Sequence, residues 1–265
     1  MKTKKIYQVD TFTNEPFKGN PAGVMIVDNT VDKKWMQQMA AEMNLSETAF
    51  LKPEKDGFSI RYFTPLDEVP LCGHATLASA HIIYELGLVS KTATITFYAS
   101  ETTLTINRQG NSIVMDFPKY PYTKIATPFQ FKEIVGFDPV EVYASSYQWI
   151  IGIAADAYDI RTAVPDFELM KRNRLGHLMI TAKSDVADAD FVVRCFAPSL
   201  GIDEDPVTGS AHCALTPLWA GKLDKTKLRS LQLSKRTGEL EVELVDNRVL
   251  ITGKALTIFE AVLKI

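Results

Sequence analysis

The chain has 265 residues, of which 46% are hydrophobic and 23% charged, a composition typical of a globular protein with one large domain or two of ordinary size. Its formal net charge of −3 argues against a general attraction to nucleic acid, and no apolar run reaches membrane-spanning length or resembles a signal peptide. Three cysteines are too few for a disulfide framework, so we expect a cytoplasmic protein without nucleic-acid or membrane partners.

Strands and two helices are predicted in the first half of the chain. Short alternating or β-branched runs predict strands over residues 5–10, 23–27, 58–63, 92–97, 101–106 and 112–117. Asp32 is placed to cap a helix over 33–43, whose methionines fall on one face. A second helix is predicted over 74–86, where Gly87 ends it. Because this second helix is apolar almost all round, we expect it to be buried.

A connection between two halves is expected at residues 117–129, which carry three prolines and little periodicity. We therefore divide the chain into domains 1–118 and 119–265, and the final strand could return to the first domain. An apolar helix is predicted to begin near Ser210 in the second half. Each half is thus expected to be a barrel-like, mostly antiparallel sheet wrapped around one central helix, which is an α+β fold. Strands in this half are predicted over residues 141–145, 149–154, 176–182, 190–196, 230–234, 239–244 and 248–253.

The two central helices have similar entrances. Setting residues 71–80 against 207–216 pairs Gly73 with Gly209 and His74 with Ser210, which suggests an internal duplication. The first N–H groups of a helix have no partner inside it, and the helix dipole is positive at this end. Two such entrances that face one cleft would bind an anion, most simply a carboxylate.

Four ordered blocks of the sequence carry a family resemblance: 9–24 (VDTFTNEPFKGNPAGV), 45–51 (LSETAFL), 60–80 (IRYFTPLDEVPLCGHATLASA) and 204–212 (EDPVTGSAH). They resemble the signature blocks of the PhzF, or phenazine biosynthesis-like, family. The resemblance implies a fold similar to diaminopimelate epimerase, with two pseudo-symmetric domains and an active site in the cleft between them. It also implies a homodimer, for which the strand at 92–97 is a candidate edge.

The resemblance also implies an active site. The general acid/base falls on Glu47, the cleft histidine on His74 and a further acid on Asp205. No metal or cofactor is implied. A carboxylate held away from water beside a second acid and a histidine has a raised proton affinity, so Glu47 could lift a proton from one carbon and return it to another. The positions that hold the substrate carboxylate or line the same cleft are Asn20, Ser46, Gly73, His74, Gly209 and Ser210.

Rival chemistries are weaker on the same residues. Two-thiol racemisation needs a cysteine at each helix entrance, but Thr208 stands where a partner for Cys72 is required, and a hydroxyl has a pKa far above that of a thiol. Cys72 is therefore interpreted as a small buried residue. A metal site built from Cys72, His74, His212 and Cys213 lacks the usual ligand spacing, and we expect His212 to be structural.

A serine hydrolase at Ser210 is not indicated either, because the flanking residues do not form a nucleophile elbow. The sequence predicts a cofactor-free isomerase that moves a proton, and with it a double bond, in a small carboxylate-bearing substrate, most simply a cyclic or unsaturated one. The alternative is a member of the same family that binds a metabolite or another protein without turnover.

Overall fold

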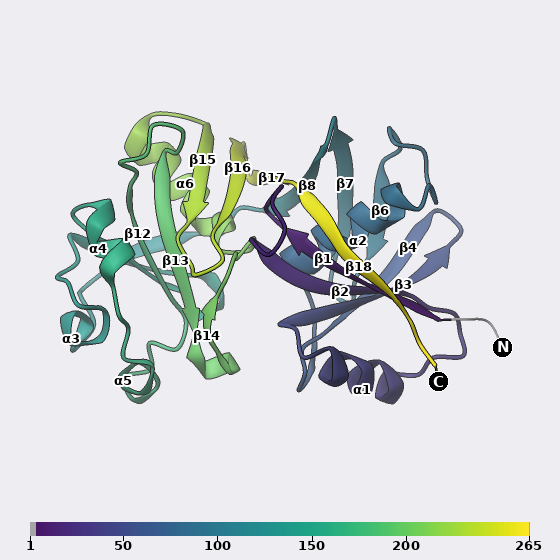
Figure 1. The fold of residues 1–265 in the computed structure, drawn as a ribbon. Coiled ribbons are helices and arrows are strands. Elements are labelled where there is room, and N and C mark those ends of the chain that lie inside the picture. The colour runs from purple at the N-terminus through teal and green to yellow at the C-terminus, as the bar shows by residue number, and fades with distance from the viewer. Residues whose placement is uncertain (1–3, 265) are drawn as a thin grey trace. The chain divides into compact units, whose positions relative to one another are not determined.

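The structure is a computed structural model that describes residues 4–264 (Figure 1). By compactness the chain divides into two units. Unit 1 contains the residues up to Phe117 together with those from Ile251 onward, and unit 2 comprises Pro118–Leu250. None of the helices in the described residues is long and apolar enough to cross a membrane.

Unit 1 is built from a continuous run of paired strands. Its strands are β1 (Lys5–Thr11), β2 (Asn20–Ile26), β3 (Glu47–Glu54), β4 (Gly57–Phe63), β5 (Glu68–Val69), β6 (Ile95–Tyr98), β7 (Thr103–Gln109), β8 (Ser112–Pro118) and β18 (Ala255–Val262). They pair in the order β18–β1–β2–β3–β4–β6–β7–β8, and only β2–β3 and β4–β6 are parallel. The edge expected at residues 92–97 is absent, because β6 pairs with β4 on one side and β7 on the other.

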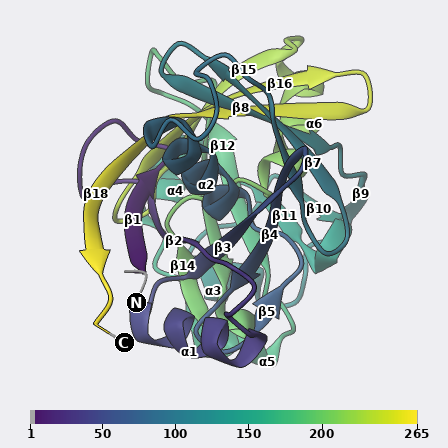
Figure 2. The same ribbon diagram turned by 90° about the vertical axis from the view of Figure 1, so that its right-hand side faces the viewer.

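Helix α2 (Gly73–Glu85) lies among these strands and contacts β1, β2, β3 and β18 (Figure 2). Eleven of its 13 residues are buried, as predicted from its apolar sequence. Its buried hydroxyls are satisfied within the helix: Thr76 Oγ1 donates to the Cys72 carbonyl at 2.6 Å, and Ser79 Oγ donates to the Ala75 carbonyl at 2.7 Å. The amphipathic helix α1 (Lys33–Met43) begins at the predicted cap, where Asp32 Oδ1 accepts from the Trp35 N–H at 2.8 Å.

Unit 2 has its own strands and its own apolar helix. The strands are β9 (Tyr122–Ile125), β10 (Glu141–Ser145), β11 (Ile150–Ile153), β12 (Leu178–Lys183), β13 (Phe191–Ala197), β14 (Ile202–Asp205), β15 (Lys227–Gln232), β16 (Gly238–Val245) and β17 (Arg248–Gly253), the last of which ends in unit 1. They pair in the order β9–β10–β11–β12–β13–β15–β16, and only β11–β12 and β13–β15 are parallel. The helices are α3 (Phe131–Val135), α4 (Ala157–Thr162), α5 (Phe167–Arg172) and α6 (His212–Leu223).

The two units repeat the same order of pairings. In unit 1, β2–β3 is parallel, β3–β4 antiparallel and β4–β6 parallel; in unit 2, β11–β12, β12–β13 and β13–β15 follow the same sequence. Each unit also places a short strand, β5 or β14, antiparallel to the third of these strands, directly before its apolar helix. This shared topology supports the duplication suggested by the two helix entrances.

Matching ion pairs hold the short strands. In unit 1, Arg61 Nε lies 2.7 Å from Glu68 Oε1 and one of its terminal nitrogens 2.8 Å from Oε2. In unit 2, Arg194 makes the same two-pronged contact with Glu204, at 2.7 and 2.9 Å. Such bidentate pairs fix the geometry of both partners. Each pair therefore anchors the strand that leads into a central helix.

Glu68→Gln is expected to destabilise the protein by about 1 kcal/mol at pH 7, a modest value because solvent screens the pair. Hydrogen bonding to Arg61, together with a weaker contribution from Lys33 at 2.8 Å, lowers the pKa of Glu68 from 4.5 to about 2. A depressed folded-state pKa gives stability that is present above the unfolded pKa and is lost as pH falls toward 2. Urea unfolding of wild type and variant at pH 7 and pH 3 measures this, and the difference should shrink at pH 3.

Glu260→Gln is the comparison, because the exposed Glu260 pairs with Lys5 at 2.7 Å and hydrogen-bonds Tyr7, without a bidentate contact with an arginine. Its effect should be smaller than that of Glu68→Gln at pH 7. Equal effects would contradict a special role for the bidentate pair.

Candidate active site

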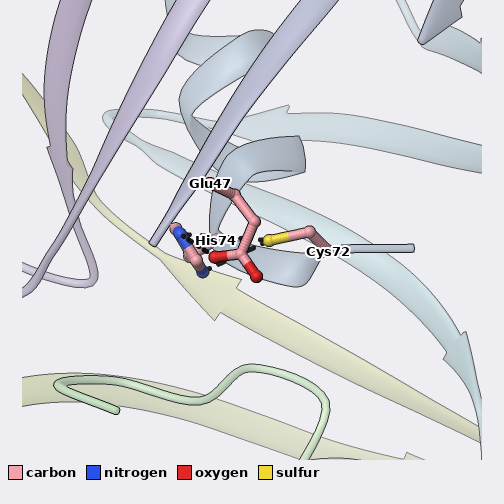
Figure 3. A group of neighbouring side chains, drawn as sticks. All are labelled: Glu47, Cys72 and His74. Carbon is pink, nitrogen blue, oxygen red and sulfur yellow. Dashed lines mark hydrogen bonds and ion pairs between the residues drawn. The ribbon is translucent and has the colours of Figure 1, made fainter. Parts of the chain in front are cut away.

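Glu47 is placed by the parallel pairing of β2 and β3. It is the first residue of β3 and lies beside Ala22, so it sits at the same end of the sheet as Asn20, the first residue of β2. The N-terminus of α2, with His74 as its second residue, reaches this end. Three chain segments that are far apart in the sequence therefore meet at Glu47, and Figure 3 shows side chains from two of them.

The side chains that meet there form a hydrogen-bonded cluster. Glu47 Oε2 lies 3.2 Å from His74 Nε2, and Ser46 Oγ lies 3.4 Å from the same nitrogen. On the other side of the ring, Asn20 Nδ2 lies 3.2 Å from His74 Nδ1. The structure thus brings together four of the residues predicted from the sequence: Asn20, Ser46, Glu47 and His74.

His74 is a neutral ring in this setting. Burial lowers its pKa from 6.5 to about 3. Its contact with Glu47 is therefore a hydrogen bond between a neutral imidazole and a carboxyl group rather than an ion pair, because the ring carries no charge near pH 7. The Glu47 side chain itself keeps 15% of its surface exposed, so the carboxyl group remains accessible to a small ligand.

Cys72 lies closer to this cluster than the sequence suggested. It is buried, as predicted, and its Sγ also lies 3.3 Å from His74 Nδ1. The ligand atoms of Glu47, Cys72 and His74 all lie within 4.8 Å of one another (Figure 3), and thiolate, imidazole and carboxylate are zinc ligands. The positive end of α2 adjoins Cys72, however, and this potential disfavours a cation.

The start of α2 offers N–H groups to an anion. Cys72 is extended and makes no side-chain cap, and the first regular helical bond runs from the Thr76 N–H to the Cys72 carbonyl at 3.0 Å. The N–H groups of Gly73, His74 and Ala75 precede that bond, so they have no acceptor within the helix. This entrance is the kind of carboxylate cradle that was predicted for Gly73 and His74.

Asp205, Gly209 and Ser210 lie in unit 2. Asp205 ends β14, and its Oδ2 accepts from Thr208 Oγ1 at 2.5 Å. Helix α6 begins at His212, two residues later than predicted, because the N–H groups of His212 and Cys213 bond the carbonyls of Gly209 and Ser210 at 3.0 and 3.1 Å in a tighter turn. It remains a prediction that Asp205, Gly209 and Ser210 act in the same site as Glu47.

Gln232 is a buried polar residue of this turn that the sequence analysis did not single out. Its Nε2 donates to the Asp205 carbonyl at 2.7 Å, and its Oε1 accepts from the Thr208 N–H at 2.8 Å. The side-chain amide of Gln232 thereby hydrogen-bonds the backbone at both ends of the turn from Asp205 to Thr208. A glutamine within an alternating strand gives no signal of this role, because its partners lie 24 and 27 residues earlier.

His212 is structural, as predicted. The ring is fully buried, its Nδ1 lies 2.9 Å from the Thr208 carbonyl and its Nε2 lies 2.8 Å from Ser230 Oγ. Both nitrogens are thus engaged within unit 2, which leaves neither for the metal site considered with Cys72.

The strand order of the two units and their central helices define the fold class of the protein. Two units with one strand order, each around an apolar helix, form the α+β epimerase-like fold that was predicted. A hydroxyproline epimerase from Agrobacterium vitis, solved as a crystal structure, shares that fold alone, with a TM-score of 0.64 at 11% identity over 98% of this chain and 92% of that one.

The family follows from closer similarity. The model of the phenazine biosynthesis-like proteins (PhzC-PhzF) matches residues 9–261, and the chain belongs to this family. A protein of Halalkalibacterium halodurans that is named an uncharacterized isomerase is 44% identical over 262 residues, which cover 98% of each chain. The crystal structure of a PhzF-family protein from Enterococcus faecalis has a TM-score of 0.94 at 34% identity, over 99% of this chain and 100% of that one.

Proposed function

We propose that the protein is an isomerase that moves a proton within a small carboxylate-bearing metabolite, with Glu47 as the acid/base and without a cofactor. The observation that carries the proposal is the Glu47 carboxyl group, partly exposed and 3.2 Å from a neutral histidine at a helix N-terminus. The isomerase names of similar proteins agree with it.

The proton moves in two balanced steps. The Glu47 carboxylate takes a proton from a carbon of the substrate. The electron pair of that C–H bond forms a new double bond to the adjacent carbon, and the pair of the existing double bond moves to its far carbon. The same glutamic acid then protonates the carbon at the far end of the shifted system. Substrate and product have the same formula, and the enzyme ends in its starting protonation state, so no redox partner is required.

The substrate carboxylate would sit on the N–H groups at the start of α2. Gly73, His74 and Ala75 offer these donors, and the positive helix end stabilises negative charge that builds up as the proton leaves. In this proposal Gly209 and Ser210 also contact the substrate and Asp205 also takes part in the reaction, as the family resemblance implies.

A metabolite extract in D₂O tests the function. Wild-type protein should add deuterium to at least one carboxylate-bearing compound, which mass spectrometry detects as a gain of one mass unit, and Glu47→Gln should not. Glu54→Gln is the control, because this glutamate lies on the same strand but is exposed. A compound that binds wild type and is neither deuterated nor converted to an isomer would favour the binding-only alternative.

A further inference from the structure

We propose that Asn20 fixes which nitrogen of His74 carries the proton, and that it acts on the site through His74 rather than by touching substrate. The Asn20 side chain is fully buried, with 0% of its surface exposed. Its amide contacts the cluster at both ends, the nitrogen facing His74 and the oxygen facing Ser46. This assignment differs from the substrate contact predicted from the sequence.

The ring nitrogen that faces Asn20 must accept. Asn20 Nδ2 is a donor only, and it lies 3.2 Å from His74 Nδ1. A neutral imidazole carries one N–H, so when Nδ1 accepts, the proton resides on Nε2. The Cys72 thiol, 3.3 Å from Nδ1, can also donate to it, which favours the same tautomer.

The contact with Ser46 agrees with this orientation of the amide. The Ser46 hydroxyl donates to Asn20 Oδ1 at 3.3 Å, and the NH₂ end of the amide faces the ring. The hydrogen bonds then run in one direction, from Ser46 to Asn20, from Asn20 to His74 and from His74 Nε2–H to the Glu47 carboxylate at 3.2 Å. Each donor in this chain faces an acceptor.

The tautomer has a consequence for the proposed reaction. Because Nε2 already carries a proton, His74 cannot take one from Glu47 at that nitrogen, and the proton on Glu47 is directed to the substrate. His74 instead donates to the carboxylate and orients it. This consequence rests on the proposed function, whereas the assignment of the tautomer rests on the hydrogen bonds alone.

Nitrogen-15 NMR of protein labelled at histidine tests the assignment without a substrate. Long-range ¹H–¹⁵N spectra distinguish the protonated ring nitrogen from the unprotonated one, and a His74→Gln sample identifies the His74 signals. In wild type we expect the unprotonated signal on Nδ1 of His74. His212 is an internal reference of the opposite kind, because its Nδ1 must donate to the Thr208 carbonyl. A proton on Nδ1 of wild-type His74 would overturn the proposal.

Asn20→Asp tests the cause. A carboxylate at position 20 can only accept, so Nδ1 of His74 must become protonated and its unprotonated signal must disappear, while the His212 signals stay in place. Asn107→Asp, at an exposed position of β7, is the matched control and should leave the His74 ring unchanged. An Asn20→Asp protein that keeps an unprotonated Nδ1 contradicts the proposal. If that variant does not fold, the wild-type spectrum decides, and neither result depends on whether the protein is an isomerase.

Discussion

Glu47→Gln is expected to slow solvent-proton exchange into the substrate by at least ~100-fold, the usual size of a general acid/base contribution. Glutamine keeps the shape of the side chain and can still accept from His74 Nε2–H, but it cannot take up and release a proton. The fold should survive, because the Glu47 side chain is only part of a cluster at the end of β3. Proton NMR in D₂O on the compound identified by the extract screen gives the rate, and a urea titration gives the stability.

Cys72→Ala is the informative comparison, because this thiol shares the cluster with Glu47 but has no matching cysteine in unit 2, where Thr208 occupies the equivalent position. We expect a rate within about tenfold of wild type, since alanine removes only the weak contact with His74. An inactive Cys72→Ala protein beside an active Glu47→Gln protein would mean that the thiol, and not the carboxylate, moves the proton.

The central helix of unit 1 was predictable because its signal is local. A 13-residue helix that is apolar almost all round and stops just before Gly87 is stable only when other elements surround it. Helix α1 was predictable for a related reason, since its cap and its buried methionines lie within one short segment. Patterns of this kind need no knowledge of the rest of the chain.

Strand β3 was missed, although it carries Glu47. Its last three residues are Lys52, Pro53 and Glu54, so the apolar part is too short for an alternating pattern, and the proline argues against a strand. The three short helices of unit 2 were missed because five or six residues span less than two turns. The site residue was therefore found through the family resemblance and not through the strand.

The contacts between side chains at the site could not be predicted from spacing. Asn20 and His74 are 54 residues apart, and their hydrogen bond depends on the parallel register of β2 and β3 and on the direction of α2. The repeat was partly hidden for another reason: Arg61 and Arg194 are 133 positions apart, whereas Glu68 and Glu204 are 136 apart. The connections between the paired strands are equally long, at residues 64–67 and 198–201, and the shift arises because Arg194 and Glu204 lie further from the turn along their strands than Arg61 and Glu68 do.

Gly19→Ala is expected to destabilise the protein by on the order of 3 kcal/mol, among the largest effects of a single added methyl group. Gly19 has a φ of +66°, and a Cβ there would lie 2.0 Å from the Thr11 carbonyl oxygen and 2.8 Å from Thr13 Cγ2. A backbone oxygen cannot retreat as a flexible side chain can, so the start of β2 must move. The midpoint and slope of a urea titration measure the loss.

Gly110→Ala separates the two causes of that loss. Gly110 has a similar φ of +61°, but nothing lies within 4 Å of the position of its Cβ, so its replacement reports the backbone strain alone, about 1 kcal/mol. The additional loss at Gly19 then measures the collision with Thr11.

Because Asn20 follows Gly19 and pairs with Thr11, the same movement should also displace the Asn20 amide from His74. Gly19→Ala protein that remains folded should therefore show altered His74 ring signals, whereas Gly110→Ala should not. Equal losses of stability in the two variants, with an unchanged His74 ring in both, would show that this glycine serves only a turn and has no part in holding the site.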